Sequence, residues 1–205
     1  MSALTRNILL AILVASTAAI TYVVTLPDYE IFWTREVPSK QSITELSQAL
    51  SDPSNWPVFT QALKSVKVQD TKSPFKVGSV ITYEIEPVQK EWKRFTLNVE
   101  VLHWDGVNLH LKVLEDSKQK LAKIFKTLEW KLKLLPASPD DQKLGYQSRV
   151  YGEAVAFTKS WRSRLFGKLS PRILMHQVYY FDLMKLATFQ KQKVAKEANL
   201  PPDYQ

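Results

Sequence analysis

Hydrophobic and polar positions change their spacing several times along the chain, and each change marks a predicted element. Residues 8–26 contain no charged side chain. Residues 29–37 are rich in aromatic and branched side chains, which indicates a strand. Apolar positions three and four residues apart predict a helix over residues 42–50. Asp52 before Pro53 then predicts the N-cap and first position of a second short helix.

Alternating apolar residues predict the strands of an antiparallel sheet with one buried face. A short strand is expected over residues 66–70, and the last one over residues 146–157. The apolar rows of the strands between them are Ile81, Tyr83 and Ile85; Phe95, Leu97, Val99, Val101 and His103; Val107, Leu109, Leu111 and Val113; and Leu128, Trp130, Leu132 and Leu134. The matching row of the last strand is small and leaves room for a close neighbour: Gly152, Ala154 and Ala156.

The Asp105-Gly106 turn joins two of these rows, and the hydrophobic pattern favours one loop length. A two-residue loop would place the valines of one strand opposite His110 and Lys112. A three-residue loop with a left-handed Gly106 keeps both apolar rows on one face, because a shift of one residue turns every side chain over. The pairs that the three-residue loop predicts are His103 with Val107, Val101 with Leu109 and Val99 with Leu111.

A broad apolar surface predicts a long helix from Ser170 as N-cap and Pro171 to about Ala195. Its apolar residues are Ile173, Leu174, Val178, Tyr180, Phe181, Leu183, Met184 and Ala187. The predicted fold class is therefore α+β, with a curved antiparallel sheet wrapped on a long C-terminal helix and two short helices after the first strand. Side chains do not always fill the space between such a sheet and helix, so an apolar ligand cavity is expected there.

Three stretches of the chain resemble the START-like superfamily, also called SRPBCC or helix-grip, which includes polyketide cyclase and dehydrase-like proteins. They are TREVPSKQSITELSQALSDPSNWPVFTQAL, VKVQDTKSPFKVGSVITYEI and SPRILMHQVYYFDLMKLATF. The first is similar to the family's strand and helix pair, the second to a short strand followed by Gly78, and the third to its grip helix. Together they span about residues 30–192. The resemblance implies an internal apolar pocket, but the superfamily includes carriers, receptors and cyclases, so it implies no particular substrate.

The uncharged segment over residues 8–26 is close to the roughly 20 residues with which a helix spans a bilayer. Arg6 precedes it, and Asp28 and Glu30 follow it. The positive-inside rule therefore predicts a single-pass anchor with the domain on the non-cytoplasmic side, which is periplasmic in a bacterium. A cleaved signal peptide, with small residues over 15–19 and a secreted product, is the main alternative. A core helix of the soluble fold is a third.

The composition suits one folded domain behind a membrane segment. The chain has 205 residues, 45% of them hydrophobic, so we expect a membrane segment over residues 1–27 and one START-like ligand-binding domain over residues 28–200. It has no Cys, which excludes disulfides and thiolate metal sites. The net charge of +8 is spread along the chain without a zinc-finger, RNA-binding or helix-turn-helix pattern. A solvated or membrane-facing surface is therefore expected, and no nucleic acid.

The sequence contains no Gly-rich phosphate loop, G-x-S-x-G or H-E-x-x-H motif, and its spacing suggests no metal site, so no catalytic residue, cofactor or metal is expected. His103 is predicted to face the concave side and His110 the outer side. The outward strand faces carry acidic residues that are expected to be solvated: Glu84, Glu86, Glu91, Glu100 and Glu129. Tyr83, Trp130, Tyr180 and Met184 suit the lining of the cavity and a solid core equally. The full set of candidates to line the cavity is Ile81, Tyr83, Leu97, Val99, Val101, His103, Leu109, Leu111, Trp130, Leu132, His176, Tyr180 and Met184.

Residues 161–169, WRSRLFGKL, alternate cations with aromatic residues and leucines. Cations beside aromatic side chains suit a membrane interface, where they meet anionic headgroups and the hydrocarbon boundary. The membrane-interface candidates are Trp161, Arg162, Arg164, Phe166 and Lys168. An ordinary loop between a strand and a helix, with buried aromatics, is the alternative.

The expected function is membrane-tethered binding or transfer of a hydrophobic small molecule, such as a lipid or quinone, in an internal cavity. Two other classes stay open. An enzyme of the cyclase, dehydratase or hydrolase type would use His103, Tyr83 or Tyr180 as acid-base groups. A non-catalytic protein-interaction module would have its cavity filled. The lack of a catalytic motif favours binding over catalysis.

Overall fold

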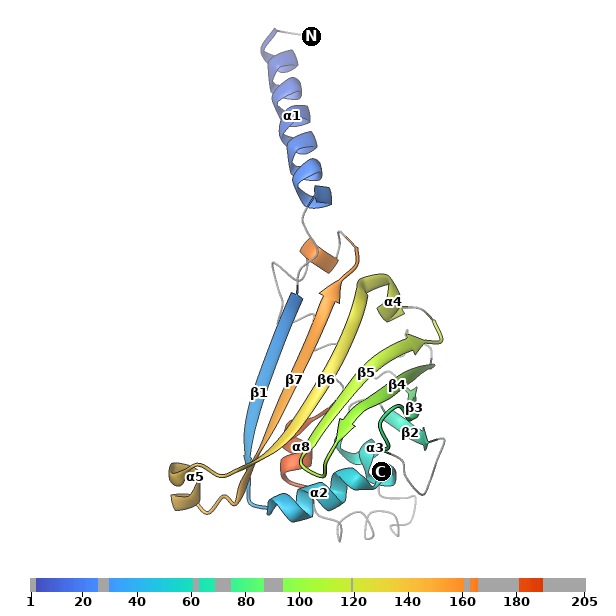
Figure 1. Cartoon of the computed structure of the whole chain (residues 1–205). Coiled ribbons are helices and arrows are strands. Elements are labelled where there is room, and N and C mark those ends of the chain that lie inside the picture. The colour runs from blue at the N-terminus through green and yellow to red at the C-terminus, as the bar shows by residue number, and fades with distance from the viewer. Residues whose placement is uncertain are drawn as a thin grey trace, which may run out of the picture.

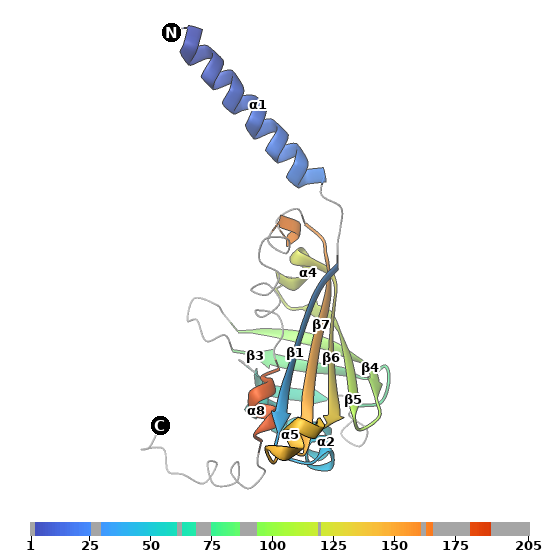
Figure 2. The same cartoon turned by 90° about the vertical axis from the view of Figure 1, so that its left-hand side faces the viewer.

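The computed structural model describes residues 3–25, 30–60, 63–68, 75–86, 94–118, 120–160, 163–165 and 181–189. Its centre is a curved sheet of seven strands in the order β1-β7-β6-β5-β4-β3-β2, and all neighbours are antiparallel (Figures 1 and 2). The strands are β1 (Glu30–Ser39), β2 (Leu63–Val68), β3 (Val80–Ile85), β4 (Phe95–Trp104), β5 (Asn108–Asp116), β6 (Phe125–Pro136) and β7 (Ser148–Thr158). The predicted α+β class with a curved antiparallel sheet is therefore confirmed.

Two short helices follow β1, as the sequence predicts. Ser42 caps the first of them with a capping box, in which its hydroxyl accepts the N–H of Glu45 and its own N–H donates to the Glu45 carboxylate. Asp52 caps the second and Pro53 is its first residue. The helices are α1 (Ala3–Thr25), α2 (Ile43–Ser51), the 3-10 helix η1 (Pro53–Asn55), α3 (Trp56–Phe59), α4 (Lys120–Ile124), α5 (Pro139–Lys143) and α8 (Leu183–Ala187). The hydrophobic pattern predicts neither α4 nor α5. For the segment that contains α5, it indicates a polar loop over residues 136–145.

The sheet has two ends that differ in what lies beside them. At one end, Glu30 of β1 pairs with Phe157 of β7, and Thr158 pairs with Phe125 of β6, which directly follows α4. Only residues 26–29 separate α1 from this end, so we call it the α1 end and the opposite one the distal end (Figure 1). α1 is exposed over Thr5–Tyr22, and this segment is long and apolar enough either to cross a membrane or to serve as a signal sequence.

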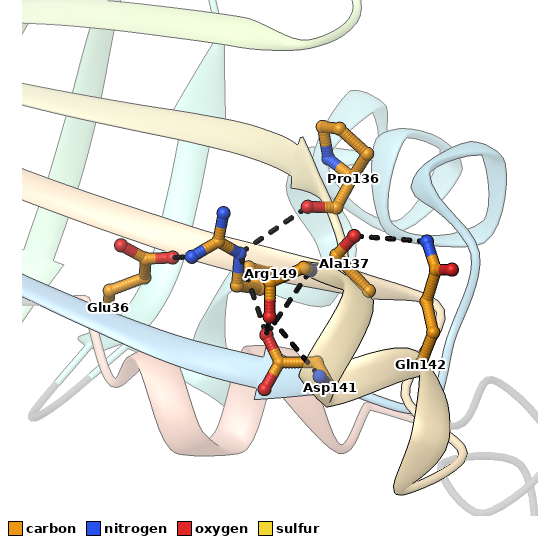
Figure 3. A network of polar contacts seen from close by, with 7 residues as sticks. Glu36, Pro136, Ala137, Asp141, Gln142 and Arg149 are labelled. Carbon is orange, nitrogen blue, oxygen red and sulfur yellow. Dashed lines mark hydrogen bonds and ion pairs between the residues drawn. The ribbon is translucent and has the colours of Figure 1, made fainter.

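At the distal end, Arg149 of β7 joins three elements. Its guanidinium forms ion pairs with Glu36 of β1 and with Asp141 of α5, where Nε and Oδ2 are 3.7 Å apart (Figure 3). The same Nε donates to the Pro136 carbonyl at 3.4 Å, and Gln142 of α5 donates to the next carbonyl at 3.1 Å. The loop after β6 is therefore held onto the sheet by polar contacts.

Large aromatic side chains fill the concave face of the sheet. Trp56 of α3 has no exposed surface, and its ring centroid lies 5.3 Å from that of Phe75, 5.8 Å from Tyr83 and 5.5 Å from Phe181. Tyr83 in turn stacks on Trp130 of β6, at 6.2 Å and an interplanar angle of 4°. The interior between these rings is therefore a packed core.

The β4–β5 hairpin differs from the predicted register. The observed pairs are Val99 with Val113, Val101 with Leu111, His103 with His110 and Trp104 with Leu109. Asp105 explains the difference, because its carboxylate accepts the backbone N–H groups of Val107 and Asn108 at 2.9 and 2.7 Å, and the Asn108 amide at 2.8 Å. These bonds hold a wider turn than the pattern predicts. Gly106 is left-handed, with φ of +90°, as predicted.

The hairpin keeps its apolar face but loses one predicted member of it. Val101 pairs two residues further along β5 than predicted, and an even shift leaves both apolar rows on the same side. The register then shifts between Val101 and His103, which turns the His103 side chain outward. The expected concave position of His103 is therefore wrong.

The chain does not run as one unbroken helix through residues 181–189. Phe181 pairs with Thr60 as an isolated bridge, and the N–H of Asp182 donates to the Phe59 carbonyl at 2.8 Å. Asp182 then caps α8, because its carboxylate accepts the backbone N–H groups of Met184 and Lys185. The predicted long helix is therefore wrong over this part, and residues 170–180 and 190–195 lie outside the described residues.

Candidate functional site

A gap opens in the sheet between β5 and β6 at the α1 end. The two strands pair only over residues 108–112 and 129–133, then diverge, and α4 connects them (Figure 1). Asp116 at the end of β5 fixes the start of α4. It is 3% exposed, and its carboxylate accepts the N–H of Leu121 at 2.7 Å and that of Lys118 at 3.1 Å. Because α4 is too short to be stable alone, the hydrogen bond from Leu121 to the buried Asp116 carboxylate is what stabilises its first turn.

The gap holds a pocket of about 270 Å³. Its lining residues are Val113, Leu114, Glu115, Asp116, Leu121, Phe125, Lys126, Thr127, Leu128 and Lys159. The apolar side chains of Leu121, Phe125 and Leu128 are buried, whereas Lys126 and Lys159 are exposed. The pocket therefore offers an apolar floor to a hydrocarbon group and a cationic rim to a polar or anionic one.

Most predicted cavity residues are buried on the concave face, away from this pocket. They are Ile81, Tyr83, Leu97, Val99, Val101, Leu109, Leu111, Trp130 and Leu132, and they belong to one continuous core. None of them lines the β5–β6 pocket. The pocket uses neighbouring residues of the same strands, namely Val113, which follows Leu111 on β5, and Leu128, which precedes Trp130 on β6.

Tyr83 differs from its core neighbours because it carries a polar atom. Its hydroxyl is buried and has no hydrogen-bond partner among the described residues. Burial raises the pKa of Tyr83 well above its usual range, so the phenol stays neutral and keeps its proton. Leaving a buried hydroxyl unpaired costs about 1–3 kcal/mol, which favours a polar ligand group or a water beside it.

The other predicted site residues lie elsewhere. The His103 side chain is 53% exposed, with Nε2 3.3 Å from the Asp105 carboxylate, and Met184 is 49% exposed, so neither lines the interior. Arg164 lies half-buried in a helical turn over residues 163–165. The candidates outside the described residues are His176, Tyr180, Trp161, Arg162, Phe166 and Lys168.

The acidic residues of the outer sheet face are exposed or half-buried, as predicted: Glu84, Glu86, Glu100 and Glu129. Glu91 lies outside the described residues. Glu129 is not simply solvated, since its carboxylate lies 2.8 Å from Nε2 of His110 on the neighbouring strand. Within the described part of the chain, no group of three or more His, Asp or Glu is placed to hold a metal ion.

Comparison with protein-family models gave no match, and no curated protein matches the chain. Solved structures do match. The major latex-like protein 151 of Panax ginseng is 14% identical with a TM-score of 0.50, over 73% of this chain and 97% of that one. Norcoclaurine synthase of Thalictrum flavum, in complex with dopamine and hydroxybenzaldehyde, is 9% identical with a TM-score of 0.52, over 85% and 91%. The di-domain ARO/CYC StfQ from the steffimycin biosynthetic pathway is 10% identical with a TM-score of 0.55, over 81% and 52%.

At these identities the likeness shows the fold and carries no activity with it. The matches agree with the resemblance seen in the sequence, and so does the order of one strand, two short helices and six further antiparallel strands. The chain therefore has an SRPBCC-type, START-like helix-grip fold.

Proposed function

We propose that this chain is a membrane-anchored protein that binds an apolar small molecule, such as a lipid or a quinone, in the β5–β6 pocket. The observation that carries the proposal is the lining of the pocket, with a buried apolar floor beside an exposed cationic rim. Such a lining removes hydrocarbon surface from water and leaves a polar head at the opening. The norcoclaurine synthase structure, in complex with two small aromatic molecules, supports small-molecule binding on this fold.

The position of the pocket supports uptake from a bilayer. The link over residues 26–29 limits the distance between the end of α1 and Glu30 to about 18 Å. Glu30 pairs with Phe157, and Lys159, two residues further on, lines the pocket. An anchor this close raises the concentration of membrane ligands at the opening.

The size of the pocket limits what it encloses. Its volume of about 270 Å³ is just below the usual range for drug-sized ligands. A single ring or a segment of an acyl chain fits such a volume, with the remainder of the ligand outside. Each methylene group buried there contributes about 0.8 kcal/mol before ordering costs.

Photo-crosslinking of the full chain in lipid nanodiscs tests this proposal, with a fatty acid that carries a diazirine on its chain. We expect crosslinked peptides from residues 113–128. Thr127→Trp places a large ring in the pocket lining and should reduce crosslinking about tenfold, the equivalent of about two methylene groups of lost burial. Thr34→Trp, at an exposed position of β1, is the matched control and should crosslink as the unmodified chain does. Equal crosslinking of both variants would contradict binding in this pocket.

Catalysis is a second candidate function, favoured by the buried and unpartnered hydroxyl of Tyr83. A phenol kept neutral by burial can donate a hydrogen bond to a bound substrate. His103 is exposed at a turn and does not share this environment. Tyr83→Phe removes only the hydroxyl, so we expect it to abolish turnover of any substrate found while leaving ligand binding within about threefold. Turnover that persists in this variant would exclude the Tyr83 hydroxyl as a catalytic hydrogen-bond donor.

A further inference from the structure

The α1 end carries an excess of positive charge among the described residues. Its cations are Lys118, Lys123, Lys126, Lys159 and Arg164, and its carboxylates are Glu30, Glu115 and Asp116. Asp116 is buried against the amides of α4, and Glu115 accepts a hydrogen bond from Asn98 at 3.0 Å. Lys123 and Lys159 are exposed, and neither forms an ion pair with a described carboxylate. The charges of Lys123 and Lys159 are therefore available to an external partner.

The distal end carries charges of both signs among the described residues. Its carboxylates include Glu45, Asp52, Asp105, Asp140 and Asp141, and its cations outside the Arg149 network include Lys40, Lys143 and Lys185. Lys123 and Lys159, which are exposed and have no ion-pair partner in the described part of the chain, lie at the end of the sheet that α1 precedes (Figure 2). An anionic surface attracts an end that carries such unpaired cations.

Exposed aromatic side chains lie at the same positive end. Phe32 of β1 is 57% exposed and Phe157 of β7 is 42% exposed, and both lie within two residues of a strand terminus there. Phe32 pairs with Val155, and Glu30 with Phe157, so the two rings share the outer face of neighbouring strands. Aromatic rings beside lysines are the combination that inserts at the boundary between headgroups and hydrocarbon.

We propose that the α1 end docks on the anionic headgroups of the bilayer that holds α1. Lys123 and Lys159 contact the headgroups, and Phe32 and Phe157 enter the interface. The inference rests on the membrane anchoring in the proposed function, but it does not depend on ligand binding. Docking turns the β5–β6 pocket, which Lys159 borders, toward the membrane surface.

A fluorescence experiment on the full chain tests the docking, and the absence of native Cys makes single-site labelling direct. Leu114→Cys places a fluorophore at the α1 end, and Leu144→Cys places one at the distal end, both at exposed leucines. Each chain is reconstituted in nanodiscs that contain a nitroxide-headgroup lipid, with phosphatidylcholine alone or with added phosphatidylglycerol. We expect quenching at position 114 to rise with phosphatidylglycerol, and quenching at position 144 to stay unchanged. Salt at about 1 M should cancel the rise, because the Debye length falls to about 3 Å.

Paired lysine substitutions identify the contact. Lys123→Gln with Lys159→Gln should lower the docking equilibrium constant about 30-fold, since each lysine near an anionic surface contributes a factor of about five. Lys40→Gln with Lys143→Gln is the matched control, which removes two exposed distal lysines and should leave docking unchanged. Equal quenching in the two lipid mixtures, or equal effects of the two lysine pairs, would overturn the docking. A chain that does not remain in the nanodiscs would overturn the membrane anchoring as well as the docking. If quenching at position 114 rises with phosphatidylglycerol but the diazirine fatty acid does not crosslink, only ligand binding in the β5–β6 pocket is overturned.

Discussion

Trp56→Ala is expected to lower the free energy of unfolding by about 3–5 kcal/mol, the usual cost of replacing a core tryptophan or phenylalanine with alanine. Trp56 has no exposed surface, and it packs against Phe75, Tyr83 and Phe181. Its indole N–H also donates to the Leu50 carbonyl at 2.8 Å, so the substitution leaves a buried acceptor without its partner. The loss is a large part of the roughly 5–15 kcal/mol that stabilises a typical domain.

Denaturation of the full chain in nanodiscs, followed by near-ultraviolet circular dichroism, measures this loss. Trp33→Ala on β1 is the matched control, because Trp33 is only half-buried at the edge of the core. We expect about 1–2 kcal/mol for the control, in proportion to the smaller area that it removes from water. Similar losses for the two tryptophans would show that the space around Trp56 is loosely filled, as in the large internal cavity that the sequence predicts.

Burial on one face of each strand explains why so much of the sheet could be predicted. Alternation places every second side chain inward, and Ile81, Tyr83 and Ile85 are buried as the pattern requires. The small residues Gly152 and Ala154 are buried where a close neighbour was expected. The hairpin register could not be obtained in this way, because it depends on three hydrogen bonds to a single turn carboxylate, and these leave no periodic trace.

The candidate site depends on features that periodicity does not record. Residues 118–126 place four lysines among apolar residues with neither helical nor strand spacing, so α4 is not evident. Its start depends on Asp116, and the pocket depends on where β5 and β6 stop pairing, which is a property of the whole sheet. One available sign was missed in the last predicted helix. Asp182 stands within an apolar run, and aspartate is a frequent N-cap, so a helix start at α8 could have been considered.

Lys131→Met is expected to lower the free energy of unfolding by about 2–3 kcal/mol at neutral pH, because it leaves a carboxylate of the sheet without its cation. The Glu153 side chain on β7 is 10% exposed, and its carboxylate accepts from Nζ of Lys131 at 2.7 Å and from the Tyr151 hydroxyl at 3.1 Å. Breaking a fully buried ion pair costs about 3–5 kcal/mol. The loss expected here is smaller because the Lys131 side chain is 32% exposed.

The effect of Lys131→Met should depend on pH. Burial raises the pKa of Glu153, but the hydrogen bond and charge of Lys131, together with Tyr151, outweigh it and hold the pKa below its usual value. A carboxyl with a lowered folded pKa contributes stability that is present above its unfolded pKa of about 4.3, and this stability is lost as pH falls through the folded pKa. Without Lys131, burial dominates and protonation relieves the variant. The difference in stability between the two proteins should therefore narrow as the pH falls through the raised pKa of Glu153 in the variant and on through its lowered pKa in the unmodified chain.

Denaturation of both proteins across this pH range, with Lys133→Met as the matched control, separates the ion pair from a general loss of charge. Lys133 lies two residues along the same strand, and its Nζ is 5.7 Å from the centroid of the Tyr151 ring. Because that contact is a cation–π interaction near the surface, we expect its loss to cost about 0.5–1 kcal/mol. Glu153→Gln added to Lys131→Met should restore part of the stability, since it removes the uncompensated charge. A stability difference that does not change with pH, or equal losses for the two lysines, would show that the ion pair between β6 and β7 does not stabilise this sheet.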